Sequence, residues 1–241
     1  MIKEIKTLSI IIPVFNEEER LKKNLIQINR YIKNKKIEVI IVNDGSTDST
    51  KEIIKQFIKI NKKIKVINLK NNLGKGGALK KGILNAKNKF ILTMDLDLSV
   101  PISQVFEWFQ KKYVNDSFLI YFGSRNHKKS IIKYKLYRKI IGIILNIITR
   151  FILNINIKDT QCGFKLYHNN TAKLLFSKIT RQGYEHDIEI AIIARNKKIL
   201  IKELPVKWKH QSGSKVNVLI DSIKFLFGVI MLKIRYFSNT Q

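Results

Sequence analysis

The chain has 241 residues, enough to bury one α/β core, and its length calls for no more than a single domain over residues 1–241. Its 46 Lys plus Arg against 18 Asp plus Glu give a formal net charge of +28, which favours an anionic membrane surface, a phosphorylated substrate or a nucleic acid as partner. Lys, Ile and Asn are abundant throughout, so compositional bias explains part of this charge equally well. The lone Cys162 excludes an internal disulfide and is either a buried structural thiol or a catalytic one.

The first half of the chain alternates short β-branched runs with helical patterns, which is typical of βαβ units and a largely parallel sheet. The predicted strands are 8–14, 37–43, 65–68, 90–95 and 118–123, and the predicted helices are 17–33, 47–60, 75–86 and 102–112. Ser46 or Thr47 should cap the second helix, and Pro101 should begin the fourth. We expect a doubly wound, Rossmann-like α/β sheet whose ligand crevice lies outside the carboxyl ends of the strands. Four segments should meet there: 16–19, 44–48, 71–77 and 95–99.

The second half of the chain has a different pattern. It predicts an amphipathic helix at 131–153, a strand near 163–167, helices near 170–177 and 185–196, a strand pair around 199–208 and a final helix. The apolar stretches 140–157 and 216–237 contain polar and charged residues, so neither is expected to span a bilayer. These residues are Asn146, Arg150, Asn154, Asp221, Lys224 and Lys233. Both stretches suit C-terminal amphipathic, interfacial helices that lie on a membrane, although a core helix with a basic first turn would also fit 131–153.

The N-terminal segment carries no targeting pattern. Residues 1–7 lack an apolar region, and the apolar run at 8–14 is far too short to cross a bilayer. Neither a signal peptide nor an N-terminal anchor is therefore expected. We expect a peripheral protein on the cytoplasmic face of a membrane.

The strongest chemical signal is Asp95-Leu96-Asp97 at the end of an apolar strand. Two carboxylates at this spacing, where regular pleating is lost, can be directed at one hard cation, which in turn can bridge a diphosphate. The motif therefore predicts a Mg²⁺ or Mn²⁺ site at Asp95 and Asp97. A plain acidic turn is the alternative for an isolated motif of this kind.

Two strand-to-helix turns upstream suggest further ligand contacts. Asp44 can accept from ribose hydroxyls or a base N–H, and Gly45 allows a close backbone approach, although a simple capped turn would look the same. Gly74-Lys75-Gly76-Gly77 begins a helix, so its free N–H groups and Lys75 could hold phosphate. The spacing is neither that of a P-loop nor G-x-G-x-x-G, which argues against a nicotinamide-dependent oxidoreductase.

Taken together, these motifs resemble glycosyltransferase family 2. The motifs are Ile11-Ile12-Pro13-Val14-Phe15-Asn16-Glu17-Glu18, Val42-Asn43-Asp44-Gly45-Ser46, Asn72-Leu73-Gly74-Lys75-Gly76-Gly77 and Met94-Asp95-Leu96-Asp97. The resemblance implies a GT-A fold, the nucleotide-diphospho-sugar transferase type. It also implies that Asp44 binds the nucleoside and that Asp95 and Asp97 hold the metal on the donor diphosphate. The expected nucleotide-sugar contacts are Pro13, Phe15, Glu17, Asp44, Gly45, Lys75, Asp95 and Leu96.

Motifs in the second half look like the branch of dolichyl-phosphate β-glucosyltransferases and bacterial polyprenyl-phosphate glycosyltransferases. They are Gly123-Ser124-Arg125, Asp159-Thr160-Gln161-Cys162-Gly163-Phe164-Lys165-Leu166, Asp187-Ile188-Glu189, and Trp208 with Gly213-Ser214-Lys215. This resemblance implies inverting transfer of a hexose, first of all glucose from UDP-glucose, to a polyprenyl or dolichyl phosphate at a membrane surface; GDP-mannose is the other donor. Members of the branch carry membrane anchors that are not expected here, so a separate membrane protein is a candidate partner. Asn43 also departs from the branch, because many family members have Asp there.

The resemblance assigns roles to the second half. Residues 1–125 are expected to form the nucleotide-sugar-binding half, and 126–241 the half that faces acceptor and membrane. The expected acceptor-phosphate residues are Arg125, Arg138, Gln161 and Lys215, the last as a lid, and the expected catalytic residues are Asp97, Asp187 and Arg125. Asp187 is expected to act as a base or hydroxyl anchor, while for Arg138 a solvated basic helix face is the alternative. A phosphate monoester is already ionised at neutral pH, so it needs no strong general base.

Two rival functions remain at this stage. A family 2 enzyme acting on a soluble glycan, a protein or a growing polysaccharide would use the same donor chemistry. A basic nucleic-acid-binding protein would explain the charge, but it predicts aromatic residues within a basic groove, whereas the aromatic residues here are scattered. We therefore expect no nucleic-acid partner.

Overall fold

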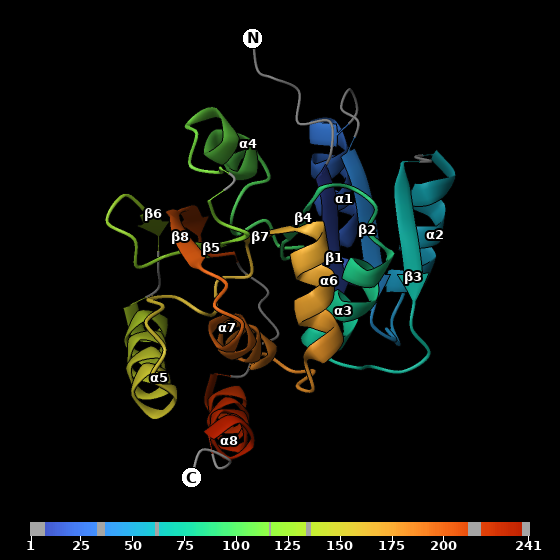
Figure 1. Cartoon of the computed structure of the whole chain (residues 1–241). Helices are drawn as coiled ribbons and strands as arrows, with labels where there is room; N and C mark the ends of the chain where they lie inside the picture. The colour runs from blue at the N-terminus through green and yellow to red at the C-terminus, as the bar shows by residue number, and fades with distance from the viewer. Residues whose placement is uncertain are drawn as a thin grey trace.

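The computed structural model describes residues 8–32, 37–60, 63–115, 117–133, 136–211 and 218–237 (Figure 1). The elements in chain order are β1 (Leu8–Val14), α1 (Glu18–Ile32), β2 (Ile37–Asn43), α2 (Thr50–Ile60), β3 (Ile64–Asn68), α3 (Lys75–Asn85), β4 (Phe90–Thr93), α4 (Ser103–Gln110), β5 (Ile120–Ser124), β6 (Ile131–Lys133), α5 (Leu136–Leu153), β7 (Lys165–His168), α6 (Asn169–Lys178), α7 (His186–Asn196), β8 (Ile201–Pro205), β9 (Lys207–Lys209) and α8 (Val218–Phe237).

The main sheet has seven strands in the order β3-β2-β1-β4-β7-β5-β8. Strand β7 runs antiparallel to both of its neighbours, β4 and β5, and the other neighbouring pairs are parallel. The predicted mostly parallel α/β sheet is therefore confirmed. The short strands β6 and β9 pair in a second sheet.

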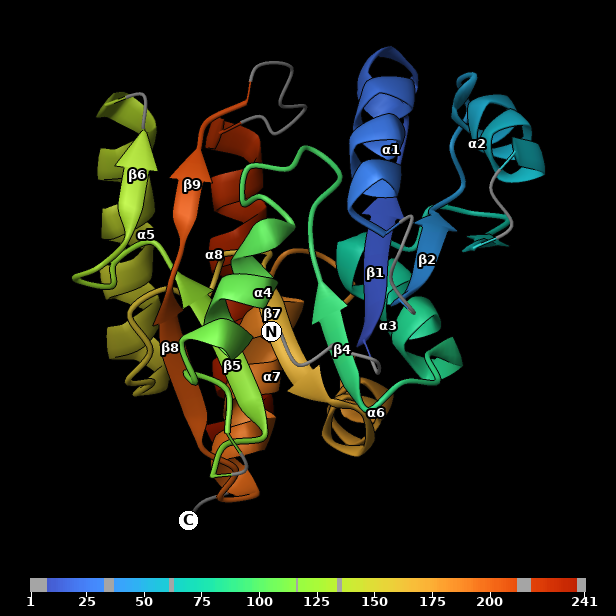
Figure 2. The same ribbon diagram turned by 90° about the horizontal axis from the view of Figure 1, so that it is seen from above.

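Helices cover both faces of the main sheet (Figures 1 and 2). One core cluster packs α1, α2 and α4 against the sheet, and the other packs α3, α6 and α7 with parts of α5 and α8. Successive side chains of β1 alternate between the two clusters, Ile10 and Ile12 in one and Ile11 in the other. Because both faces are buried, the central strands are continuous apolar runs.

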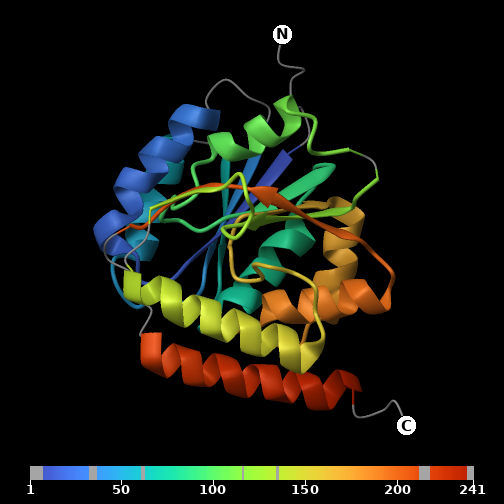
Figure 3. The same cartoon turned by 90° about the vertical axis from the view of Figure 1, so that its left-hand side faces the viewer.

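Helices α5 and α8 lie side by side and run in the same direction on the outside of the second layer (Figure 3). The inner face of α8 contributes Phe225, Val229 and Leu232 to the core. Within the described parts of the chain, every helix is too short or too polar to cross a membrane. Both helices also expose apolar side chains to solvent.

Three local predictions were wrong. The predicted helix 131–153 begins only at Leu136, because Ile131–Lys133 pairs as a strand with Lys207–Lys209. Helix α4 begins at Ser103, two residues after Pro101.

Helix α2 begins at Thr50, whose N–H donates to the Asp48 carboxylate, so neither Ser46 nor Thr47 caps it. These two residues instead bond to the loop after β1: Ser46 Oγ accepts from the Asn16 N–H, and the Thr47 N–H donates to Asn16 Oδ1. In each case a contact with a distant segment overrides the local capping signal.

Candidate active site

The loops beyond the carboxyl ends of β1, β2, β3 and β4 lie together, as the parallel topology predicts. The loop after β1 is held by the loop after β2, since the Glu17 N–H donates to Thr50 Oγ1 at 2.7 Å. The loop after β3 reaches the loop after β2 through Leu73, and the loop after β4 through Lys75. These contacts gather the four predicted segments into one crevice.

Asp44 follows β2 and is only 3% exposed. Its Oδ1 accepts a hydrogen bond from the Leu73 N–H at 2.8 Å. Burial raises the pKa of Asp44 above its usual value, although hydrogen bonds from the Leu73 and Gly74 N–H groups lower it in part. Asp44 thus fixes the loop after β3 to the end of β2.

Gly45 adopts a φ of +70° and has the backbone of Asn71 beside it. A Cβ at Gly45 would lie 2.6 Å from the carbonyl carbon of Asn71. The close approach that we expected at Gly45 is therefore made by the protein's own chain, and any side chain here would push the loop after β3 out of place.

The N-terminus of α3 differs from the prediction of free N–H groups. The Gly76 N–H donates to the carbonyl of Gln182 at 2.7 Å, and the Gly77 N–H approaches the same oxygen at 3.4 Å. A carbonyl from the loop before α7 thus occupies the donors that we expected to hold phosphate. Lys75 remains as the charged group that α3 brings to the crevice.

The acidic pair lies just beyond β4, which ends at Thr93, two residues earlier than predicted. Lys75 Nζ lies 2.6 Å from Asp95 Oδ1. Asp97 accepts a hydrogen bond from the Ser99 N–H. The pKa of Asp97 is raised, mainly by burial and to a smaller extent by the neighbouring Asp95 carboxylate. Although burial alone would lower the pKa of Lys75, the carboxylates of Asp95 and Asp187 raise it above its usual value.

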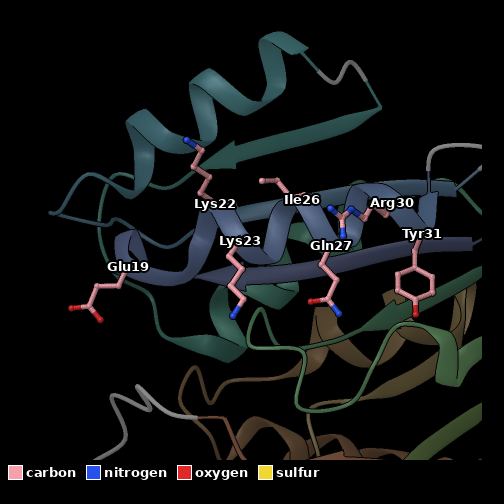
Figure 4. A pocket seen from close by; sticks show the side chains of 7 residues that line it. All are labelled: Glu19, Lys22, Lys23, Ile26, Gln27, Arg30 and Tyr31. Atoms are coloured by element: carbon pink, nitrogen blue, oxygen red, sulfur yellow. The ribbon is translucent and has the colours of Figure 1, made fainter.

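Both carboxylates line one small pocket. Its wall is made by Asp95, Asp97, Ser99, Val100, Cys162, Gly163, Phe164 and Trp208. The pocket therefore joins the donor-side loop after β4 to the turn before β7 and to β9. By contrast, a shallow groove along the outer surface of α1 has no part in this site (Figure 4). It is lined by Glu19, Lys22, Lys23, Ile26, Gln27, Arg30 and Tyr31.

The residues present fit a hard divalent cation. Two carboxylates at one pocket can supply oxygen ligands, which hard cations such as Mg²⁺ and Mn²⁺ prefer. Gly163 makes room for the Asp95 carboxylate, because a Cβ at Gly163 would lie 2.2 Å from Asp95 Oδ2. Two protein ligands would leave room for a diphosphate and water on such a cation, as is usual for Mg²⁺.

The remaining predicted donor residues are Pro13, Phe15, Glu17 and Leu96. Phe15 is 40% exposed just after β1, Pro13 lies opposite Val42 one residue before the end of β1, and Leu96 is buried in the core. Glu17 binds Arg20 through both carboxylate oxygens. Glu17 is also the main cause of the raised pKa of Arg20, to which the charges of Asp97 and Asp95 contribute less.

The turn before β7 is built on Asp159, which is 2% exposed. Its oxygens accept from Arg125 Nε at 2.8 Å and from an Arg125 terminal nitrogen at 2.9 Å, and also from the N–H groups of Arg125, Gln161 and Cys162. Although burial would raise the pKa of Asp159, Arg125 lowers it. Arg125 also lies over the Trp208 ring, 6.0 Å from its centroid. Gln161 is half-buried beside this pair, with Nε2 3.5 Å from Thr160 Oγ1.

Asp187 is the second residue of α7 and is buried, with 4% of its surface exposed. Its Oδ2 lies 2.9 Å from Lys165 Nζ, and its Oδ1 lies 3.2 Å from His186 Nε2. Both oxygens of this carboxylate therefore face side chains of the protein itself.

 Although burial alone would raise the pKa of Asp187, His186 and Lys165 lower it well below its usual value.

Two predicted acceptor residues cannot be placed in this way. Arg138 belongs to α5, but its side chain lies outside the described residues, and Lys215 lies outside them altogether. Their roles stay predictions. Sequence reasoning also passed over Arg20 and Lys165, which looked like ordinary surface cations in a Lys-rich chain. Only the apolar neighbours of Lys165, in the run Gly163-Phe164-Lys165-Leu166, pointed to a buried position.

Solved structures share this architecture. Glucosyl-3-phosphoglycerate synthase from Mycobacterium tuberculosis, in complex with Mn²⁺, UDP and glucosyl-3-phosphoglycerate, has a TM-score of 0.69 and 16% identity over 94% of this chain and 79% of that chain. The same enzyme with Mn²⁺, UDP-glucose and phosphoglyceric acid has a TM-score of 0.66 and 17% identity over 94% and 79%. At such identity the likeness shows the fold alone, and that fold is the predicted GT-A type.

The sequence matches are more specific. Residues 9–176 match Glycosyl transferase family 2, and the chain belongs to this family. It is similar to dolichyl-phosphate beta-glucosyltransferases from Trichomonas vaginalis (32% identity, 96% of this chain and 74% of the relative), Saccharomyces cerevisiae (33%, 95% and 75%) and Homo sapiens (30%, 97% and 77%). The protein is therefore a glycosyltransferase, and the predicted resemblance is confirmed.

Proposed function

We propose that this glycosyltransferase moves glucose from UDP-glucose to dolichyl phosphate or another polyprenyl phosphate at a membrane surface. The names of the similar dolichyl-phosphate beta-glucosyltransferases support the acceptor and the sugar. The observation that carries the proposal is the pocket in which Asp95 and Asp97 meet Gly163 and Trp208. Here the donor-side carboxylates lie directly beside the turn that Arg125 and Asp159 organise, so donor and acceptor can meet.

The donor side of the site would hold the nucleotide sugar through the loops beyond β1 to β4. Asp44 would face the nucleoside, with Gly45 keeping the loop after β3 in place. Lys75 would neutralise diphosphate charge, since its ammonium already lies at the acidic pair. The remaining proposed contacts are Pro13, Phe15, Glu17, Asp95 and Leu96.

Asp95 and Asp97 would hold Mg²⁺ or Mn²⁺. A bound cation supplies electrophilic stabilisation of the charge that develops on the leaving diphosphate. Arg20, held in place by Glu17, keeps positive charge near the two carboxylates. Together these groups favour binding of an anionic donor.

The acceptor would be an ionised phosphate monoester. One of its oxygens forms the new bond to the anomeric carbon while the bond from that carbon to the UDP oxygen breaks, so a single displacement inverts the configuration and UDP leaves. No proton has to be removed from an ionised phosphate, so no strong base is required. Arg125, held in a fixed orientation by Asp159, is suited to position the phosphate. Gln161, Arg138 and Lys215 are proposed to assist it.

The outer faces of α5 and α8 would contact the membrane. Their exposed apolar side chains recur at helical spacing on adjacent helices, and basic residues accompany them. The apolar residues are Ile144, Ile147 and Phe151 on α5, and Ile223, Phe227, Ile230 and Ile234 on α8. We propose peripheral attachment on the cytoplasmic side, with 1–125 serving the donor and 126–241 the acceptor and membrane. A separate membrane protein would be an additional partner.

The purified protein should be incubated with a polyprenyl phosphate in detergent, Mn²⁺ or Mg²⁺, and a panel of UDP- and GDP-sugars. Mass spectrometry should show a prenyl-phosphate-glucose made from UDP-glucose, and EDTA should abolish it. Product formed only from GDP-mannose would show that the donor is GDP-mannose and not UDP-glucose. Transfer to a soluble glycan or protein, with the lipid phosphate untouched, would refute the proposed acceptor and leave the family assignment intact.

A further inference from the structure

A buried ion pair lies beneath the donor site. The side chains of Lys165 and Asp187 are 1% and 6% exposed, and Lys165 Nζ lies 2.9 Å from Asp187 Oδ2. The same ammonium donates to the Cys162 carbonyl at 2.6 Å and lies 4.8 Å from the centroid of the Phe122 ring. A buried charge is costly unless it is paired and hydrogen-bonded, and this ammonium has both kinds of partner.

One end of the pair supports the turn behind Asp95. Lys165 holds the Cys162 carbonyl, and the next residue, Gly163, lies against the Asp95 carboxylate. The fit is close, because a Cβ at Gly163 would lie 2.2 Å from Asp95 Oδ2. A shift of this turn would therefore move one oxygen of Asp95.

The other end of the pair supports Lys75. The start of α7 packs on the start of α3, since a Cβ at Gly76 would lie 2.7 Å from the Cβ of His186. Lys75 and Asp187 are the chain neighbours of these two contact residues. Lys75 Nζ in turn lies 2.6 Å from Asp95 Oδ1. The two supports thus reach the two oxygens of the same carboxylate.

We propose that Lys165 and Asp187 are positioning residues for the donor site, which together hold Gly163 and Lys75 against the two oxygens of Asp95. The inference rests on the proposed function, in which Asp95 holds the divalent cation. Asp187 then acts through Lys75 and is not the base, since its oxygens face Lys165 and His186. Groups behind a metal ligand commonly change metal affinity about 10- to 100-fold when they are removed.

The test compares Lys165→Met/Asp187→Asn with the wild type. This double variant removes both charges together, so neither is left buried alone. Mn²⁺ binding in the presence of UDP is measured by calorimetry, and thermal unfolding is followed in parallel. We expect a folded protein whose Mn²⁺ affinity is at least about tenfold lower. A double variant that binds Mn²⁺ as the wild type does would overturn the inference.

Asp187→Asn alone is the second variant, because it keeps the bond from Lys165 to the Cys162 carbonyl. A positioning role predicts weaker Mn²⁺ binding together with a raised KM for UDP-glucose. A catalytic base predicts a lower kcat with Mn²⁺ affinity unchanged, which would overturn the inference. Lys65→Met is the matched control. Lys65 lies on the edge strand β3 and pairs with Glu38 on the neighbouring strand β2, away from the site. The Mn²⁺ affinity of this variant should equal that of the wild type.

The same measurements separate this inference from the proposed function. A wild-type protein that binds no Mn²⁺ in the presence of UDP would overturn both. Wild-type binding that survives in the double variant would overturn the inference alone. Wild-type binding that weakens in the double variant, but not in Lys65→Met, supports it.

Discussion

Two groups of aspartates in this molecule have opposite environments. Asp159 and Asp187 are almost fully buried, and each lies against its own cation, Arg125 or Lys165. Asp95 and Asp97 share one pocket, and the side chain of Asp95 is 41% exposed. Matched, buried pairs organise the chain around them, whereas two carboxylates that face one pocket can bind a cation from solution. The comparison distinguishes acidic residues that build the site from those that bind its ligands.

The largest effect is expected for Asp97→Ala. If Asp97 holds the metal as proposed, its loss should slow glucose transfer about 10²–10³-fold, since a bound cation contributes several kcal/mol to the transition state. Stability should be unchanged or slightly higher, because two like charges no longer share the pocket. Initial rates with Mn²⁺ and thermal unfolding measure the two quantities. A variant that keeps more than a tenth of the rate would place the metal elsewhere.

Lys165→Met should have the largest effect on stability. It leaves the Asp187 carboxylate buried without its cation, which typically costs about 3–5 kcal/mol in the free energy of unfolding. Urea unfolding should show that Asp187→Asn in the same chain restores most of this loss. If the single and double variants are equally unstable, packing of the lysine stem, and not charge, would be its main contribution.

Gly163→Ala tests the contact between the two groups of aspartates. The added Cβ would displace the Asp95 carboxylate, whose end is flexible, so Mn²⁺ affinity should fall about tenfold or more with little loss of stability. Gly142→Ala is the matched control. Gly142 lies in α5 with no atom within 4 Å of an added Cβ, so this change should leave affinity alone and raise stability by about 0.5–1 kcal/mol. Equal affinities in the two variants would contradict the role of Gly163.

The pH dependence of stability should have opposite signs at the two groups. The pKa of Asp187 is lowered on folding, so its contribution is present above about pH 4 and is lost as the pH falls further. The pKa of Asp97 is raised, so its contribution is present below about pH 4 and is lost as the pH rises through the folded pKa. Urea midpoints from pH 2.5 to 7 should therefore fall less steeply toward acid in Asp187→Asn, and should be higher near neutrality in Asp97→Asn. The same curve for both variants would reject this distinction.

The smallest effect is expected at α5 and α8, the helices proposed to face the membrane. Phe151→Ser and Phe227→Ser each remove an exposed apolar side chain from α5 or α8, and binding to anionic vesicles should weaken several-fold, or by about 1 kcal/mol. Leu200→Ser is the control, because Leu200 is 65% exposed but lies in the segment before β8. Sedimentation with vesicles measures the binding. Equal losses in all three variants would show that α5 and α8 have no special role.

Much of the donor side could be predicted from local patterns. The strands β1 and β2 have the predicted bounds, and the acidic pair follows a buried strand as expected. The predictions failed where a distant segment supplied the partner. Gln182 takes the N–H groups of Gly76 and Gly77, and β9 turns Ile131–Lys133 into a strand. No window of sequence around these residues contains the group that satisfies them.

The sequence by itself determined the class of fold, the family and the positions of Asp44, Asp95 and Asp97, because apolar periodicity and turn chemistry are local properties. Only the tertiary structure decided that Lys165 is a buried cation and Asp187 its partner. These residues come from the antiparallel strand β7 and the helix α7, and they meet because β7 inserts between β4 and β5. Strand order depends on the packing of the whole chain, so a lysine that looks like any other in a chain of net charge +28 is assigned its partner only when the sheet is complete.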